Sequence, residues 1–200
     1  ESVILSWIKK KMNDDKSPNY HDLKGGKINS GQVSTFSKLT LVAQSRVYKT
    51  PNKLPLDIAA LLGCAIPTGF GIVLKYVNRF NKKDYVGIYG AGGVGLMSII
   101  ALKALGFKNV YAVDQNKKNL DTAKKFGCKK IYNFNILKDK NKFNTEINKE
   151  KNKFNIELSG CKEMMEHAYK NLSKDGTFIL AGNTKVGQKI KINPYDLIFG

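Results

Sequence analysis

Six residues in the middle of the chain have the types and spacing of a loop that binds phosphate. Gly90-Ala91-Gly92-Gly93-Val94-Gly95 is a G-x-G-x-x-G pattern that lies between an apolar run and a helix-forming run. In such a loop the first glycine permits a tight turn, the second lets the backbone approach a pyrophosphate, and the third lets the helix pack close to a sheet. Free N–H groups around Gly93 and Val94 would donate hydrogen bonds to phosphate oxygens. We predict a dinucleotide-binding loop; the alternative is a glycine-rich turn without a ligand.

A carboxylate follows at the distance expected for recognition of a ribose. Asp114 ends the next apolar segment, 19 residues beyond Gly95. A carboxylate there accepts hydrogen bonds from the adenosine ribose hydroxyls and repels a 2′-phosphate, so we expect NAD rather than NADP. No arginine follows Asp114, although Lys117 and Lys118 weaken this preference.

The segments that position these residues alternate between strand and helix from residue 83 onward. Expected strands lie at 85–89, 109–113, 130–132, 154–158 and 177–180. Helices are expected at 93–105, 117–126 and 162–172, and residues 186–192 show a further polar–apolar alternation. Repeated βα units with short connections predict an α/β fold with a doubly wound parallel sheet of the Rossmann type.

The first third of the chain has a different pattern. Strands are expected at 3–8, 34–43 and 46–48, around a polar loop at 9–30. Two prolines close this portion, and apolar helices are expected at 56–64 and from Pro67 to about residue 80. We predict a partial β-rich domain over residues 1–55 and a nucleotide-binding domain over residues 56–200.

Taken together, these motifs resemble those of the zinc-containing alcohol dehydrogenases of the medium-chain dehydrogenase/reductase superfamily. The motifs that carry the resemblance are Ser34-Thr35-Phe36-Ser37, Leu61-Leu62-Gly63-Cys64, Pro67-Thr68-Gly69, the 90–96 loop, Val113-Asp114, Glu157-Leu158-Ser159-Gly160 and Asn193-Pro194. The resemblance implies that residues 1–55 are part of a GroES-like catalytic domain and that the last Rossmann strand lies beyond residue 200. It also implies that Thr68 and Val94 contact the nicotinamide end of the cofactor.

The resemblance further implies that Cys64 is a ligand of a catalytic zinc ion. Such an ion keeps one position open for the substrate oxygen, next to a nicotinamide that takes the hydride. The alternative is that Cys64 is a small apolar residue on a buried helix. Spacing offers no second ligand, because His21 lies in a polar loop and His167 in a late helix. The other ligands and the catalytic residues are therefore expected upstream of this chain.

Cysteine usage limits the other metal and redox assignments. Residues 9–30 contain no cysteine, so the four-cysteine structural zinc site of many family members is expected to be absent. Cys128 and Cys161 match no role in the family. Three cysteines without evident pairing favour a reducing cytoplasm. Both ends of the chain interrupt apolar runs, which predicts a central fragment of a longer protein.

The charge of the chain does not by itself indicate a nucleic-acid partner. The sequence has 34 Lys+Arg against 16 Asp+Glu, a net charge of +18, but only two of the basic residues are arginine. Nucleic-acid surfaces normally use arginine for bidentate contacts. We therefore interpret the charge as a solvated surface and expect no nucleic-acid partner. We also expect no membrane partner, because no apolar run reaches the roughly 18 residues of a membrane span.

The leading hypothesis is an NAD- and zinc-dependent oxidoreductase that transfers a hydride between NAD and an alcohol, including a polyol or sugar derivative. Its partner would be the small alcohol or carbonyl substrate, and the full-length protein would be a homodimer or homotetramer. The isolated chain is expected to be inactive. One alternative is a zinc-free quinone or enoyl reductase that uses NAD(P)H, against which Cys64 and Asp114 both count. Another is a basic protein that binds nucleotides or nucleic acid.

Overall fold

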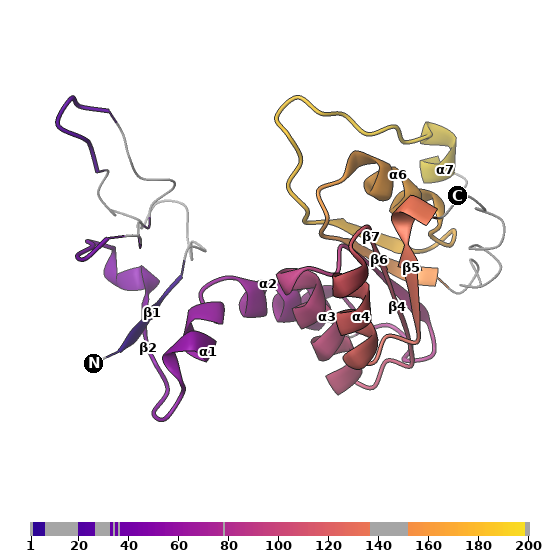
Figure 1. The fold of residues 1–200 in the computed structure, drawn as a ribbon. Coiled ribbons are helices and arrows are strands. Elements are labelled where there is room, and N and C mark those ends of the chain that lie inside the picture. The colour runs from indigo at the N-terminus through magenta and orange to yellow at the C-terminus, as the bar shows by residue number, and fades with distance from the viewer. Residues whose placement is uncertain are drawn as a thin grey trace. The chain divides into compact units, whose positions relative to one another are not determined.

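The chain folds into two units that differ in secondary structure (Figure 1). The computed structural model describes residues 2–6, 20–26, 33, 35, 37–77, 79–136 and 152–198. The units are Glu1–Pro67 and Thr68–Gly200. The domain boundary that the sequence analysis places after residue 55 follows the family resemblance and stays a prediction.

The first unit contains a short antiparallel strand pair. Strand β1 (Val3–Leu5) pairs with β2 (Val47–Lys49). Arg46, which ends the 3-10 turn before β2, is buried and donates a hydrogen bond from Nη1 to the carbonyl oxygen of Ser6 at 3.1 Å. The backbone N–H of Ser6 in turn donates to the Arg46 carbonyl oxygen, so both groups extend the pairing beyond the strands.

Two sequence expectations for this unit are wrong. Residues 37–43 of the strand expected at 34–43 have no regular structure, and the described residues include no strand that pairs with them. Leu39 and Leu41 are exposed there, so the apolar side chains of this alternating pattern do not form a buried face in this unit. The strand expected at 46–48 is displaced by one residue, because Arg46 belongs to the preceding turn. The helix that begins at Leu56 is confirmed, although α1 (Leu56–Leu61) ends before Cys64.

The second unit is built on a five-stranded parallel sheet with the order β5-β4-β3-β6-β7. Its strands are β3 (Tyr85–Tyr89), β4 (Asn109–Asp114), β5 (Lys130–Asn133), β6 (Asn152–Glu157) and β7 (Thr177–Leu180). All five expected strands are therefore present, and the Rossmann-type fold class is confirmed. Residues 186–192 carry no strand and lie in a loop.

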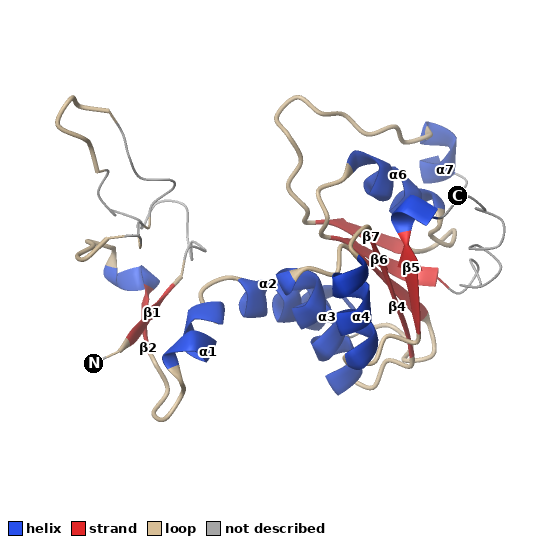
Figure 2. Ribbon diagram, viewed as in Figure 1, coloured by secondary structure: helices blue, strands red, loops and turns tan. Residues whose placement is uncertain are grey.

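Helices flank this sheet and connect its strands (Figure 2). They are α2 (Ala65–Ile72), the π-helical turn η2 (Val73–Val77), α3 (Gly93–Ala104), α4 (Lys117–Lys125), the 3-10 turn η3 (Phe134–Ile136), α6 (Lys162–Lys170) and α7 (Pro194–Ile198). The three helices expected after residue 83 are present within two residues of their predicted ends.

Both faces of the sheet are covered by helices. Alternate side chains of each strand point to opposite faces, so each strand contributes to the packing on both. Val86 and Ile88 of β3 pack with residues of α3 and α4 in one buried cluster. Tyr89 of β3 and Tyr111 of β4 pack with α6 in a second cluster. A parallel sheet covered on both faces favours nearly continuous apolar strands, which is the pattern of the central strands β3 and β4.

Polar groups join the sheet to α6. The Tyr111 hydroxyl donates to Oδ1 of Asn155 at 3.0 Å, and Nδ2 of Asn155 donates to the carbonyl oxygen of Ala168 in the last turn of α6 at 2.6 Å. Gly87 leaves room for this contact, since a Cβ there would lie 2.3 Å from both Asn155 Oδ1 and the Tyr111 hydroxyl oxygen. The asparagine is satisfied by a helix terminus that lacks intrahelical donors, which explains a polar residue within a buried strand.

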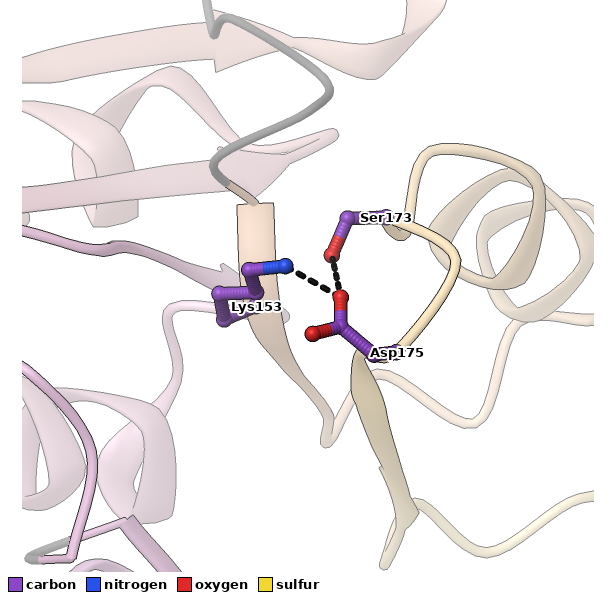
Figure 3. A network of polar contacts seen from close by, with 3 residues as sticks. All are labelled: Lys153, Ser173 and Asp175. Carbon is purple, nitrogen blue, oxygen red and sulfur yellow. Dashed lines mark hydrogen bonds and ion pairs between the residues drawn. The ribbon is translucent and has the colours of Figure 1, made fainter.

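An ion pair joins the start of β6 to the turn before β7. Lys153 contacts the carboxylate of Asp175, and the Ser173 hydroxyl lies 3.5 Å from the same Asp175 oxygen (Figure 3). The Asp175 side chain is three-quarters exposed, so the pair contributes little to stability.

Candidate functional site

The loop predicted to bind phosphate lies where the strand order of the sheet reverses. The chain moves outward from β3 through β4 to β5 on one side, and the strands after that, β6 and β7, lie on the other side. The carboxyl ends of β3 and β6 are therefore adjacent, which is where ligands bind in open α/β sheets. The glycine loop follows β3, and the segment 158–161 follows β6.

Two of the loop's glycines are required by the fold itself. Gly90 has a φ of +92°, and a Cβ there would lie 2.6 Å from the backbone nitrogen of Ser159. At Gly95 a Cβ would lie 2.0 Å from the carbonyl oxygen of Gly90. These residues let the β3 end, the β6 loop and α3 approach one another.

The other two glycines border open space. A Cβ at Gly92 or Gly93 would meet no atom within 4 Å, and both residues are exposed. Gly92 is the N-cap of α3 and has no side chain with which to cap the first N–H groups of the helix. The first N–H groups of a helix lack intrahelical acceptors and lie at the positive end of the helix dipole. Gly92 and Gly93 thus leave space for an anion at this end of α3.

Asp114, the last residue of β4, is buried and already accepts hydrogen bonds within the protein. Its Oδ2 accepts from the backbone N–H of Ala91 at 2.7 Å and from Nδ2 of Asn119 at 3.3 Å. Its Oδ1 accepts from the backbone N–H of Asn116 at 2.7 Å. The carboxylate therefore holds the glycine loop against the turn between β4 and α4, a role that the sequence analysis does not include. A carboxylate has about four acceptor sites, so one is left for a ligand hydroxyl.

Thr68 lies next to the contact between α2 and the start of α3. The following residue, Gly69, is buried, and a Cβ there would lie 2.6 Å from Met97 Cβ and 2.7 Å from the carbonyl oxygen of Val94. The Ser98 hydroxyl donates to the Gly69 carbonyl oxygen at 3.2 Å. Thr68 and Val94, both predicted to contact the nicotinamide end, are thus on elements that pack directly together.

Glu157, at the end of β6, is a site residue to which the sequence analysis assigns no role. Its side chain is fully buried, and its Oε1 accepts from the backbone N–H of Ser159 at 2.8 Å and from the Ser159 hydroxyl. Burial raises the pKa of this carboxyl above its ordinary value, against the opposing effect of hydrogen bonds from Ser159 and from the backbone of Gly160. A carboxylate at the end of an apolar strand, two residues before Ser159-Gly160, is the signal that could have indicated it.

The candidate zinc ligand, Cys64, lies in the first unit. It is exposed and belongs to the turn after α1, so it is not the buried helical residue of the alternative interpretation. No group of three His, Cys, Asp or Glu side chains that could hold a metal ion occurs within the part of the chain that the structure describes. An exposed thiol is available as one ligand of a metal whose other ligands come from elsewhere.

The remaining cysteines and histidines lie in different environments. Cys128 is buried, and its burial raises the pKa of the thiol to about 12. Cys161 is the N-cap of α6. His21 is exposed, whereas His167 is buried on α6 with its ring centroid 5.8 Å from that of Tyr89.

A parallel sheet with a glycine-rich turn at its reversal point is the architecture of Rossmann-type α/β domains. The chain belongs to the zinc-binding dehydrogenase family, whose model matches residues 93–200. It is 32% identical over 192 residues to S-(hydroxymethyl)glutathione dehydrogenase of Saccharomyces cerevisiae, covering 93% of this chain and 50% of that protein. It is 29% identical to alcohol dehydrogenase class-3 of Zea mays, covering 99% of this chain and 50% of that protein.

Solved structures agree on the fold. The crystal structure of benzyl alcohol dehydrogenase from Acinetobacter calcoaceticus is similar with a TM-score of 0.78 and 22% identity, over 98% of this chain and 59% of that one. Galactitol-1-phosphate dehydrogenase from Escherichia coli is similar with a TM-score of 0.70 and 20% identity, over 98% of this chain and 54% of that one. The chain spans about half the length of the curated relatives it matches. Among the described residues, no helix is long and apolar enough to cross a membrane.

Proposed function

We propose that this chain is the NAD-binding part of a zinc-dependent oxidoreductase that interconverts an alcohol and a carbonyl compound. The family membership and the curated relatives, which are named as alcohol and S-(hydroxymethyl)glutathione dehydrogenases, support this reaction class. The small-molecule substrate would be the main partner. In the whole protein we propose a homodimer or homotetramer in the cytoplasm, where three free cysteines would stay reduced.

The observation that carries the proposal is the open space at Gly92 and Gly93. The two glycines of this loop that the fold requires, Gly90 and Gly95, are enclosed by other protein atoms. Gly92 has ordinary backbone angles, with φ −75° and ψ −163°, and a side chain there would meet nothing. Glycine in such a place, at the start of a 12-residue helix, fits a ligand that takes the space a Cβ would occupy.

The residues of the site divide between the two halves of the cofactor. The first N–H groups of α3 would hold the pyrophosphate, and Asp114 would accept a hydrogen bond from the adenosine ribose. Thr68 and Val94 would contact the nicotinamide half from α2 and α3. When bound, NAD supplies the hydride acceptor, and a zinc ion held in part by the Cys64 thiolate supplies an electrophile for the alcohol oxygen.

Replacing Gly92 tests this proposal directly. NAD added to the chain is expected to raise its Tm, and Gly92→Val is expected to lower the affinity for NAD at least tenfold, because the branched side chain takes the place of the pyrophosphate. Since a side chain at Gly92 meets no protein atom, the Tm without NAD is expected to change little. Affinity is measured by isothermal titration calorimetry, and Tm by thermal unfolding.

Gly95→Ala is the contrasting variant. Its Cβ would lie 2.0 Å from a backbone oxygen, so this variant is expected to lose stability even without NAD. NADP, compared with NAD on the unchanged chain, is expected to bind more weakly because of Asp114. An unaltered affinity of Gly92→Val for NAD would contradict the proposed site.

A further inference from the structure

The carboxyl group of Glu157 lies beneath the loops that follow β6 and β7. Its side chain is 0% exposed. Oε1 accepts hydrogen bonds from Ser159 in the first of these loops, whereas Oε2 is buried without a hydrogen-bond partner. A buried carboxyl oxygen without a donor costs free energy, so another constraint must keep this side chain in place.

The loop after β7 provides that constraint. The backbone N–H groups of Ala181 and Gly182 both donate to the Glu157 carbonyl oxygen at 2.9 Å. A Cβ at Gly182 would lie 2.4 Å from Glu157 Oε2 and 2.5 Å from the backbone nitrogen of Gly160. The carboxyl group is therefore in contact with both loops, and only a glycine at position 182 leaves room for it.

The two loops also pack directly against each other and against the glycine loop. Gly160 has a φ of +71°, and a Cβ there would lie 2.3 Å from the carbonyl oxygen of Asn183. On the other side, Gly90 is in contact with Ser159, and the Leu158 N–H donates to the Tyr89 carbonyl oxygen at 2.7 Å. Residues 158–160 and 181–183 thus form a continuous backbone wall that starts at the glycine loop; we call it the β6–β7 wall.

The position of the β6–β7 wall indicates which half of a bound dinucleotide would lie along it. A dinucleotide bound at the reversal point of the sheet has its pyrophosphate at the glycine loop. Its adenosine half turns toward Asp114 on the β4 side. The other half must then pass along the β6 and β7 ends, because the sheet order places these strands on the opposite side of β3.

We propose that Glu157 is a positioning residue for the nicotinamide half of NAD, because its buried carboxyl group holds the β6–β7 wall in shape. This inference rests on the proposed function. It assigns Glu157 no contact with the adenosine half, which is bound at the glycine loop and Asp114. Loss of the carboxyl group should therefore weaken the binding of NAD and leave the binding of ADP, which lacks the nicotinamide half, nearly unchanged.

The experiment compares NAD with ADP on four forms of the chain by calorimetry. Glu157→Ala removes the carboxyl group, and Gly182→Ala displaces it from the β7 side without changing it. Both variants are expected to lower the affinity for NAD at least tenfold and the affinity for ADP less than twofold. Glu157→Gln keeps an oxygen for Ser159 in a side chain of the same size, and is expected to restore NAD affinity to within about threefold of the original chain.

The outcomes separate this inference from the proposed function. If the unchanged chain binds neither NAD nor ADP, the proposed function fails. Suppose instead that the unchanged chain binds both ligands. If the two alanine variants then lose affinity for NAD and for ADP to the same extent, or lose affinity for neither, the role of Glu157 is overturned. Circular dichroism of each variant establishes that it is folded, and Gly182→Ala keeps the test decisive if Glu157→Ala does not fold.

Discussion

The glycines after β3 illustrate how one pattern can combine two unrelated requirements. Gly90 and Gly95 are enclosed by backbone atoms and belong to the turn and the helix packing. Gly92 and Gly93 are open and contribute nothing to the packing of the described chain. The G-x-G-x-x-G pattern predicts both a turn and a ligand because both kinds of glycine occur within six residues, the two open ones between the two enclosed ones.

Asp114 and Glu157 are both carboxylates at strand ends, yet their environments differ. Asp114 has three donors shared between its two oxygens, whereas Glu157 has one oxygen without any. The sequence predicts the position of Asp114 from its distance to the glycine loop. It does not predict the burial of Glu157, which depends on Gly182, 25 residues later in the chain.

The pKa of Glu157 gives a pH dependence to the stability of the fold. Because burial raises this pKa above its ordinary 4.5, the folded state binds the proton more tightly than the unfolded state does. The original chain is therefore expected to lose stability as the pH rises from 4.5 through the raised value. Glu157→Gln has no such proton, so its free energy of unfolding should increase relative to the original chain over that range. Urea unfolding at a series of pH values measures this difference; a constant difference would contradict it.

The bounds of the helices and strands in the second unit agree closely with those predicted from the sequence, because the apolar periodicity of each element depends on neighbouring residues. Strands β3 and β7 have the predicted bounds, and α3 and α4 begin at the predicted residues. Strand β6 begins earlier than predicted, at Asn152, whose side-chain amide donates a hydrogen bond to the carbonyl oxygen of Asn171, the C-cap of α6. In the first unit the alternation at 34–43 misleads, since a strand needs a partner and the described residues provide none.

The contact between α2 and α3 can be tested with two glycines of the same helix. Gly69→Ala is expected to destabilise the chain by about 1–3 kcal/mol, because its Cβ would lie 2.6 Å from Met97 Cβ and 2.7 Å from a backbone oxygen. Gly71→Ala, where a Cβ meets nothing within 4 Å, is expected to stabilise it by about 0.5–1 kcal/mol through helix propensity. Urea unfolding measures both, and equal effects of the two changes would exclude close packing at Gly69.

At the scale of the whole molecule, the charged side chains to consider are the basic ones of the described residues. None of the described lysines is buried, and the one described buried cation, Arg46, donates to a backbone carbonyl. The net charge of +18 comes almost entirely from lysine, since only two of the basic residues are arginine, and its interpretation as a solvated surface stays a prediction. Family membership, rather than charge, is the informative property of the chain.

The role of Cys64 belongs to the whole protein in which this chain occurs. We expect that protein to contain one zinc ion per chain and Cys64→Ser to lose it, because the thiolate is replaced by a weaker ligand. Cys161→Ser is the control. Because Cys161 is the N-cap of α6, this variant is expected to leave the zinc content unchanged. Elemental analysis of the purified proteins measures the content. Two zinc ions per chain would contradict the predicted absence of a structural site, and an unchanged content in Cys64→Ser would contradict the assignment of Cys64.

The sequence by itself determined the parallel βα architecture, the place of the glycine loop and the family, because each depends on residues close together in the chain. Only the tertiary structure decided which glycines the fold requires, that Asp114 holds the glycine loop, and that Glu157 lies buried beneath two loops. The contact between Gly90 and Gly95 joins residues 5 positions apart in the chain. The contact between Gly90 and Ser159 joins residues 69 positions apart. Most of these contacts form only when neighbouring strands of the sheet bring their carboxyl ends together, so no local pattern encodes them.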